Sequence, residues 1–412
     1  MKKFLALTLA LVMSLSLVAC GDKKTDDTKT DAPDQTEQPA ENEGAYKVAM
    51  ITDYGDITDQ SFNQTTYEAC KAFAEDNSIE FSYFRPAGDN TADRVAMIEK
   101  AVDEGFNVIV MPGYAFGGAI VEAAPEFPDV KFIALDVAAG DLLETAVAKA
   151  GESYDFNPSN WDLNKYVDMS NVYCAVYQEE LCGYMAGYAA VKLGYKNLGF
   201  LGGMAVPAVV RYGYGFVQGV DAAAADLGLT DVTVNYVYGG QFFGDADITA
   251  VMDTWYAGGT EVVFACGGGI YTSAVDAAKK ANAKVIGVDV DQAGVIAGYA
   301  GVEGMTVTSA MKGLYPTTYD TLTDVIVNGN WDKYVGKIAT LGLVSGTDPE
   351  ANYVQIPMGD GTQWSDSFTQ DDYKAMVKDM FDGKITVSND TTKAASDFAT
   401  VITVDDQGAI KG

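Results

Sequence analysis

The stretch 53–63, DYGDITDQSFN, gathers side chains that could bind a small polar molecule. It holds the carboxylates of Asp53 and Asp59, the hydroxyl of Ser61, the ring of Phe62 and the amide of Asn63. A ring offers a flat apolar face, and carboxylates and amides offer directional hydrogen bonds. This mixture suits a small neutral ligand that is flat at one end and polar at the other. In the alternative interpretation, Asp59 or Ser61 only caps a helix, and Phe62 packs beneath it.

The residues on either side predict that this stretch is a loop between a strand and a helix. An apolar run at 46–52 is typical of a strand, and an amphipathic run at 64–77 is typical of a helix. In open α/β sheets, ligands bind beside the loops that follow the strands. The stretch is therefore a candidate binding loop.

Other predicted strands also end in polar residues or glycines. These ends are Asp136, Gly267 to Gly269, Asp289 with Asp291, and Lys312. Phe242 and Phe243 follow another predicted strand, where one ring could face Phe62 across a ligand, or both could lie in the core. Because parallel strands place their carboxyl ends at one edge, two facing lobes would gather these groups in a single cleft.

Two of these strand ends could also indicate an enzyme. Asp289 and Asp291 lie two apart, so in an extended strand both would face the cleft as a pair of catalytic carboxylates. Asp at a strand end is also a common turn residue. The glycines at 267–269 match neither the dinucleotide pattern nor the Walker pattern. The acidic residues of 53–59 do not match a calcium loop.

Apolar runs alternate with helical runs along most of the chain, which predicts βαβ units and doubly wound parallel sheets. The alternation breaks at 138–170, which we interpret as an irregular insertion. Two successive series predict two α/β lobes joined by hinge crossovers. We assign 45–170 and 299–335 to an N-terminal lobe, and 171–298 and 336–412 to a C-terminal lobe.

The composition limits the chemistry further. The chain has no histidine, which excludes a histidine-based triad or metal site. Its 58 acidic and 27 basic residues give a net charge of −31, which argues against a nucleic-acid partner. Cys70, Cys174, Cys182 and Cys266 form no Cys-x-x-Cys pair, and their disulfide state stays open.

The first 44 residues predict export and anchoring. Lys2 and Lys3 precede an apolar run that ends in LVACG, so 1–20 is typical of a signal peptide with a lipobox, and Cys20 is the predicted site of lipidation. Residues 21–44 have no aromatic or large aliphatic residue and predict a disordered tether. We therefore expect a folded body anchored by lipid on the extracytoplasmic face of the cell membrane.

Several motifs, taken in order, resemble the basic membrane lipoprotein (BMP) family, which includes PnrA-like purine nucleoside receptors of ABC transporters. They are DQSFN at 59–63, GGM at 202–204 with Gly215, Phe216 and Gly219, GVDVDQ at 287–292, and TSAMK at 308–312. The resemblance covers about 46–328. It implies a type I periplasmic-binding-protein fold and a role as the substrate-binding protein of an ABC importer.

The resemblance also implies roles for individual residues in an interlobe cleft. The ligand-binding residues would be Asp53, Phe62, Asn63, Asp136, Phe243, Gly269, Asp289 and Lys312. Phe62 and Phe243 would sandwich the base, Asn63 and Asp136 would read its edges, and Asp289 and Lys312 would hold ribose hydroxyls. Arg211-Tyr212 could instead supply the second ring.

The expected protein is a monomeric nucleoside receptor, with purines favoured, that is not an enzyme, needs no cofactor or metal, and delivers its ligand to an ABC permease. Carboxylates in the cleft would repel a phosphate, which favours nucleosides over nucleotides. The alternatives are a cell-surface receptor for a sugar or an autoinducer, and a hydrolase that uses Asp289 and Asp291.

Overall fold

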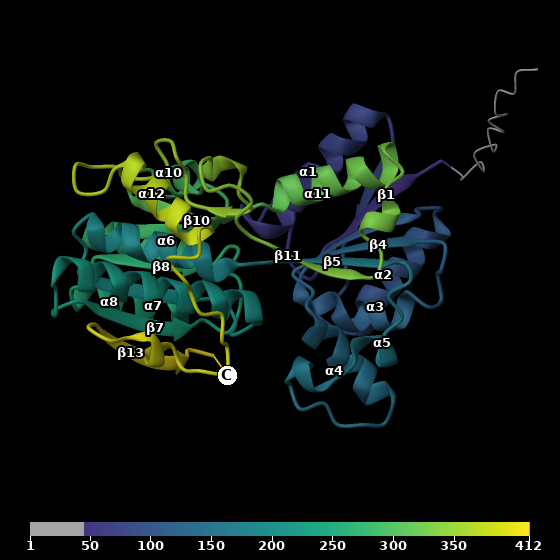
Figure 1. The fold of residues 1–412 in the computed structure, drawn as a ribbon, viewed down its shortest axis with the longest axis horizontal. Helices are drawn as coiled ribbons and strands as arrows, with labels where there is room; N and C mark the ends of the chain where they lie inside the picture. Colours follow the sequence, from purple (N-terminus) through teal and green to yellow (C-terminus); the bar gives the residue numbers. More distant parts are fainter. Residues whose placement is uncertain (1–44, 412) are drawn as a thin grey trace, which may run out of the picture. The chain divides into compact units, whose positions relative to one another are not determined.

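The computed structural model describes residues 45–411, which contain two β-sheets with helices on both faces (Figure 1). The first sheet has six strands in the order β11-β5-β4-β3-β1-β2. The second has seven in the order β12-β10-β9-β8-β6-β7-β13. The strands pair in parallel, except that β12 runs antiparallel to β10. The predicted α/β architecture with two parallel sheets is confirmed.

The strands are β1 (Lys47–Ile51), β2 (Glu80–Phe84), β3 (Val108–Pro112), β4 (Lys131–Leu135), β5 (Val172–Tyr177), β6 (Asn197–Gly202), β7 (Thr233–Tyr238), β8 (Val262–Cys266), β9 (Lys284–Asp289), β10 (Thr306–Lys312), β11 (Lys337–Leu341), β12 (Val354–Gln355) and β13 (Thr403–Ala409). The helices are α1 (Phe62–Asn77), α2 (Thr91–Asp103), α3 (Gly117–Ala123), α4 (Ala139–Lys149), α5 (Leu163–Tyr166), α6 (Glu179–Lys192), α7 (Pro207–Leu227), α8 (Ala246–Ala257), α9 (Tyr271–Ala281), α10 (Ala293–Ala300), α11 (Leu314–Leu322) and α12 (Gln370–Phe381).

The central strands are buried on both faces, which explains their continuous apolar sequences. In the first sheet, α1 and α11 cover one face and α3 and α4 cover the other (Figure 1). In the second sheet, α6 and α7 pack on one face, and α8 and α9 pack on the other. Because both faces are covered, the strand ends are the places where polar groups of the sheets can reach a cavity.

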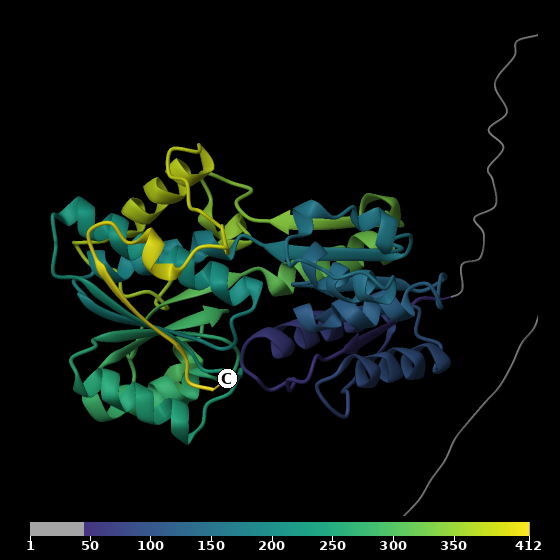
Figure 2. The ribbon, with the colours of Figure 1, turned by 90° about the horizontal axis from the view of Figure 1, so that it is seen from below.

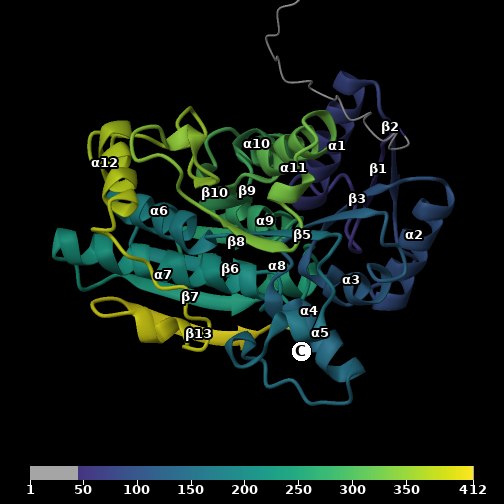
Figure 3. The ribbon, with the colours of Figure 1, turned by 45° about the vertical axis from the view of Figure 1, so that its right-hand side comes forward.

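The chain crosses between the sheets three times, after β5, after β10 and after β11. Figures 2 and 3 show these passages from two further sides. The strand membership corrects our lobe boundaries: β5 and β11 lie in the first sheet, and β10 lies in the second. We had placed the three crossings before β5, β10 and β11, whereas in the structure each crossing follows its strand. An apolar run carries no sign of which sheet it will join, so the sequence could not locate the crossings.

The segment 138–170 is not the irregular insertion that we expected. It begins with α4, which lies between β4 and β5 and so continues the alternation of strands and helices. The carboxylate of Asp141 accepts the backbone N–H of Ala138 at 2.8 Å and caps this helix. Gly140 and Asp141 are common turn residues, which is why the sequence obscured the start of α4.

Glycines allow α6 and α7 to approach closely. A Cβ atom added at Gly183 would lie 2.2 Å from the carbonyl oxygen of Tyr212, and one at Gly215 would lie 2.0 Å from that of Glu180. No side chain fits at either position. This close packing brings the first turn of α6 beside the second turn of α7.

The predicted signal peptide, the tether and Cys20 lie outside the described residues. Within 45–411 the four cysteines are free and buried. Over the same residues, none of the helices combines the length and the apolar character that a membrane span requires.

Candidate functional site

A cavity of about 410 Å³ lies where strand ends of both sheets meet. All eight residues that the resemblance singled out line it: Asp53, Phe62, Asn63, Asp136, Phe243, Gly269, Asp289 and Lys312. They lie at strand ends or in the segments that follow β1, β4, β7, β8, β9 and β10, with Phe62 and Asn63 in the first turn of α1. The structure thus brings the predicted residues together, while their contacts with a ligand stay a prediction.

The first turn of α1 presents Phe62 and Ser61 to this region. Asp59 caps the helix, since its carboxylate accepts the backbone N–H groups of Asn63 at 2.9 Å and Gln64 at 3.1 Å. The Ser61 hydroxyl is therefore free to donate to Asp289 at 2.6 Å. Phe62 is the first residue of α1 and lines the cavity, so the capped end of the helix forms part of the cavity wall.

Asp53 and Asn63 form a second polar group at the cavity wall. One Asp53 oxygen accepts the backbone N–H groups of Tyr54 at 2.6 Å and Gly55 at 2.7 Å. The Asn63 amide nitrogen donates to Asp53 at 3.3 Å and to Asp59 at 3.1 Å. Burial raises the pKa of Asp53, and the N–H donors around it act in the opposite direction. These bonds fix the orientation of the Asn63 amide.

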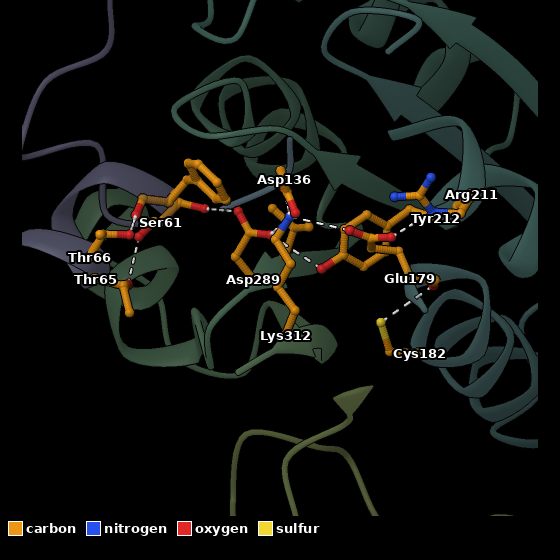
Figure 4. A network of polar contacts seen from close by, with 12 residues as sticks. Ser61, Thr65, Thr66, Asp136, Glu179, Cys182, Arg211, Tyr212, Asp289 and Lys312 are labelled. Carbon is orange, nitrogen blue, oxygen red and sulfur yellow. Dashed lines mark hydrogen bonds and ion pairs between the residues drawn. The ribbon is translucent and has the colours of Figure 1, made fainter. Parts of the chain in front are cut away.

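Lys312 is the centre of a buried charge cluster (Figure 4). Its Nζ lies 2.5 Å from Asp136, and 3.6 Å from both Glu179 and Asp289. Burial lowers the pKa of Lys312, but the three carboxylates outweigh burial and raise it. Lys312 therefore stays cationic. It links Asp136, which follows β4 of the first sheet, to Asp289, which ends β9 of the second sheet.

The lysine also meets the aromatic part of the site. Its Nζ lies 4.7 Å from the centroid of the Phe62 ring. A cation over one face of a ring is attracted by the π-electrons. Phe62 and Lys312 therefore form a junction between the apolar and the charged parts of the cavity.

Two carboxylates of the cluster stand on left-handed backbone. Asp136 has φ of 58° and Asp289 has φ of 65°, a region that residues other than glycine rarely adopt. Such strain is concentrated at functional sites, where the surrounding contacts hold it. The left-handed backbone at Asp289 also breaks the strand alternation. The prediction that Asp289 and Asp291 face the cleft together as a pair is therefore wrong. Asp291 is exposed and accepts the N–H of Ala293 at 3.1 Å, at the start of α10, outside the cavity lining.

The sequence analysis named Arg211 only together with Tyr212, as an alternative source of the second ring. In the structure, its guanidinium group forms an ion pair. Its Nε donates to the buried carboxylate of Glu179 at 2.7 Å, and the arginine lines the cavity. Within the described residues, its other N–H groups have no hydrogen-bond partner in the protein. Tyr212 also lines the cavity, and its hydroxyl donates to Asp289 at 3.2 Å from a buried position, so it supports the charge cluster.

Aromatic side chains of both lobes line the remaining wall. Phe243 is 56% exposed, whereas the neighbouring Phe242 is partly buried. The Phe242 ring packs against that of Tyr54, with 6.4 Å between the ring centroids, and the Tyr54 hydroxyl donates to the sulfur of Met204 at 3.5 Å. An exposed Phe243 is consistent with the expected second ring.

Sequence reasoning missed several lining residues, among them Tyr54, Tyr114 and Asp141. Tyr54 lies inside the loop that we had singled out, and Tyr114 follows β3 in the same way that Asp136 follows β4. Their place after a strand was the signal that could have found them. Among residues 45–411, no group of three or more metal-ligating side chains is arranged to hold an ion.

The comparisons with known proteins agree with this geometry. Residues 46–348 match the family described as ABC transporter substrate-binding protein PnrA-like (Bmp). A relative from Lactococcus lactis subsp. cremoris (strain MG1363), named ABC transporter nucleoside-binding protein BmpA, is 26% identical over 305 residues, which are 71% of this chain and 75% of that protein. An uncharacterized lipoprotein of Pyrococcus abyssi (strain GE5 / Orsay) is 24% identical over 353 residues, covering 82% of this chain and 74% of that one.

Solved structures show the same fold. A solute-binding protein of an ABC transporter system from Aeropyrum pernix K1 superposes with a TM-score of 0.59 at 19% identity. The superposition covers 86% of this chain and 90% of that one. The type I periplasmic-binding-protein fold is therefore confirmed.

Proposed function

Since the chain belongs to the PnrA-like family of ABC transporter substrate-binding proteins, we propose that it binds a nucleoside, of the purine class, and delivers it to an ABC permease. The observation that carries the proposal is the combination inside one cavity. An aromatic face at Phe62 adjoins the buried cluster of Lys312, Asp136 and Asp289. A nucleoside has the matching parts, a flat base and vicinal hydroxyls.

The size of the cavity supports a ligand of this kind. Its volume of about 410 Å³ lies at the lower end of the range of small-molecule sites, roughly 300–1,000 Å³. In our proposal the base stacks between Phe62 and Phe243, and Asn63 bonds its edge together with Asp53 and Asp136. Asp289 and Lys312 hold the ribose hydroxyls, and Gly269 offers its backbone.

The charge of the cavity supports a neutral ligand. Carboxylates outnumber cations in its lining, and the three cations, Lys312, Arg85 and Arg211, are each already paired with a carboxylate. A phosphate brought into this environment would be repelled. This argument favours nucleosides over nucleotides, and the relative from Lactococcus lactis is named as nucleoside-binding.

We further propose that the protein is a monomer anchored by a lipid on Cys20 at the extracytoplasmic face of the cell membrane. The lipobox sequence supports this, and relatives from Pyrococcus are named lipoproteins. A Cys20→Ala variant is expected to appear in the soluble fraction of cells whose wild-type protein sediments with membranes. Equal membrane association of both proteins would contradict the anchor.

A thermal-shift panel tests the ligand class. At a ligand concentration of about 100 Kd, binding stabilises the folded state by about 2.7 kcal/mol. Purine nucleosides are expected to raise the melting temperature, and nucleotides and monosaccharides are expected to leave it unchanged. A response to monosaccharides alone would assign the site to a sugar receptor, and no response to any nucleoside would refute the proposal.

A further inference from the structure

The loop of residues 239–245, which we name the rim loop, carries part of the aromatic wall of the cavity. It follows β7 and contains Phe242 and Phe243, which both line the cavity. The Phe243 side chain is 56% exposed, so little packing holds its ring. The position of that ring therefore depends on how firmly the backbone of the rim loop is held.

The chain beyond the family match returns to this loop. The match ends at residue 348, but β13 pairs with β7 at the edge of the second sheet. Beyond β13, the backbone N–H of Ile410 donates to the carbonyl of Tyr238 at 2.8 Å. A Cβ atom at Gly240 would lie 2.6 Å from the carbonyl oxygen of Lys411, so the two backbones are in close contact. Figures 1 and 2 show the end of this segment where the second lobe faces the first.

An ion pair then joins Lys411 to the far end of the rim loop. Its Nζ bonds the carboxylate of Asp245 and lies 3.7 Å from that of Asp247. Asp245 also accepts the N–H of Ile248 at 3.0 Å, which caps α8, and the side-chain amide of Gln241 at 2.8 Å. The same Gln241 amide donates to the carbonyl of Phe243 at 3.0 Å.

These contacts form a continuous path from Lys411 through Asp245 and Gln241 to the backbone of Phe243. We propose that Lys411 is a positioning residue for ligand binding: by holding Asp245 it fixes the rim loop and so places the Phe243 ring at the cavity. The inference rests on the proposed function for the identity of the ligand. The contacts from Lys411 through Asp245 and Gln241 to Phe243, which we name the brace, belong to the protein alone. It gives a role in the site to a segment outside the family match.

Hydrogen exchange of the ligand-free protein tests the brace. In Lys411→Ala, the amides of the rim loop are expected to exchange several-fold faster than in the wild type, while those of β6 and β8 keep their rates. Lys411→Arg keeps the charge and is expected to restore the wild-type rates. Lys384→Ala is the matched control, because Lys384 makes an exposed pair at 2.6 Å with Asp379 in the same region of sequence. Unchanged exchange in Lys411→Ala would overturn the proposal.

Binding of a purine nucleoside tests the consequence. Because a partly exposed ion pair contributes modestly, Lys411→Ala is expected to weaken affinity about 2- to 5-fold, with no change in Lys384→Ala or Lys411→Arg. Salt screens such pairs, so the difference is expected to shrink at about 1 M NaCl. Faster exchange with unchanged affinity would overturn the positioning role. If the wild type binds no nucleoside, the proposed function fails, and the exchange experiment still decides the brace.

Discussion

Replacing Lys312 by methionine tests the charge cluster most severely. The substitution keeps most of the side-chain volume and removes a cation that lies 2.5 Å from Asp136 and 3.6 Å from both Glu179 and Asp289. All four side chains are at most 8% exposed. Little solvent reaches these carboxylates, so water is a poor replacement for the lysine as their partner.

The size of the effect follows from these distances. Two unit charges about 4 Å apart attract by roughly 4 kcal/mol at an effective dielectric constant of 20, and desolvation offsets part of this attraction. Removing one partner of a buried ion pair typically costs about 3–5 kcal/mol. For residues 45–411, an unfolding entropy of about 0.8 kcal/mol/K converts that loss into a melting temperature lower by roughly 4–6 °C.

The loss is also expected to depend on pH. In the wild type the raised pKa of Lys312 keeps it charged through the neutral range, so its contribution persists until the pH rises through that pKa. Without the lysine, burial and mutual repulsion raise the pKa values of the carboxyls. The native variant then holds protons that the unfolded chain has lost, and its stability falls as the pH rises from about 4 to 7. The variant is therefore expected to be closer to the wild type at pH 5 than at pH 8.

Thermal unfolding followed by circular dichroism at pH 5 and pH 8 provides the measurement. Lys384→Met is the control, since it removes a solvent-exposed ion pair, and such pairs contribute little to stability. The reasoning would be refuted if Lys312→Met melted within about 1 °C of the wild type at pH 8, or if its loss were equal at both pH values.

Three further predictions concern the site and its supports. Phe62→Leu is expected to weaken nucleoside affinity about 5- to 100-fold, the range for one base–ring stack, with little change in melting temperature; titration calorimetry would show otherwise if affinity were kept. Burial raises the pKa values of Asp141 and Glu180 to about 7 each, so the native state is the more protonated and the free energy of unfolding falls as pH rises from about 4 to 7. Urea titrations of Asp141→Asn/Glu180→Gln should show a smaller fall, and an unchanged slope would contradict this. Gly215→Ala places a Cβ 2.0 Å from the carbonyl oxygen of Glu180 and is expected to cost about 1–3 kcal/mol in urea unfolding, an expectation that a neutral substitution would disprove.

Many residues that line the cavity could be predicted from the sequence because strand ends are visible in it. Asp53, Asp136, Asp289 and Lys312 each end or follow an apolar run, and parallel pairing brings such ends to one edge. Phe62 and Asn63 were identified because they lie in the predicted loop between such an end and the helix expected at 64–77. Side-chain type and local periodicity were sufficient for these residues.

The parts that escaped prediction depend on contacts between distant segments. Asp291 lies outside the cavity lining because the strand geometry is broken at Asp289, which has φ of 65°. The sequence pattern of a strand does not indicate such a break. Glu179 looked like an ordinary first residue of a helix, and its burial beside Arg211 follows from the close crossing of α6 and α7. Glycines spaced by four in both helices, including Gly183 and Gly215, were the available signal for that crossing.

Isothermal titration of the purified protein with matched ligands tests the central claim most directly. A purine nucleoside, its 5′-monophosphate and a monosaccharide are compared under the same conditions, with Phe62→Leu in parallel. The account predicts one nucleoside bound per chain, at least about 10-fold weaker binding of the monophosphate, and no heat from the monosaccharide. Tighter binding of the monophosphate, or no binding of any nucleoside, would contradict it.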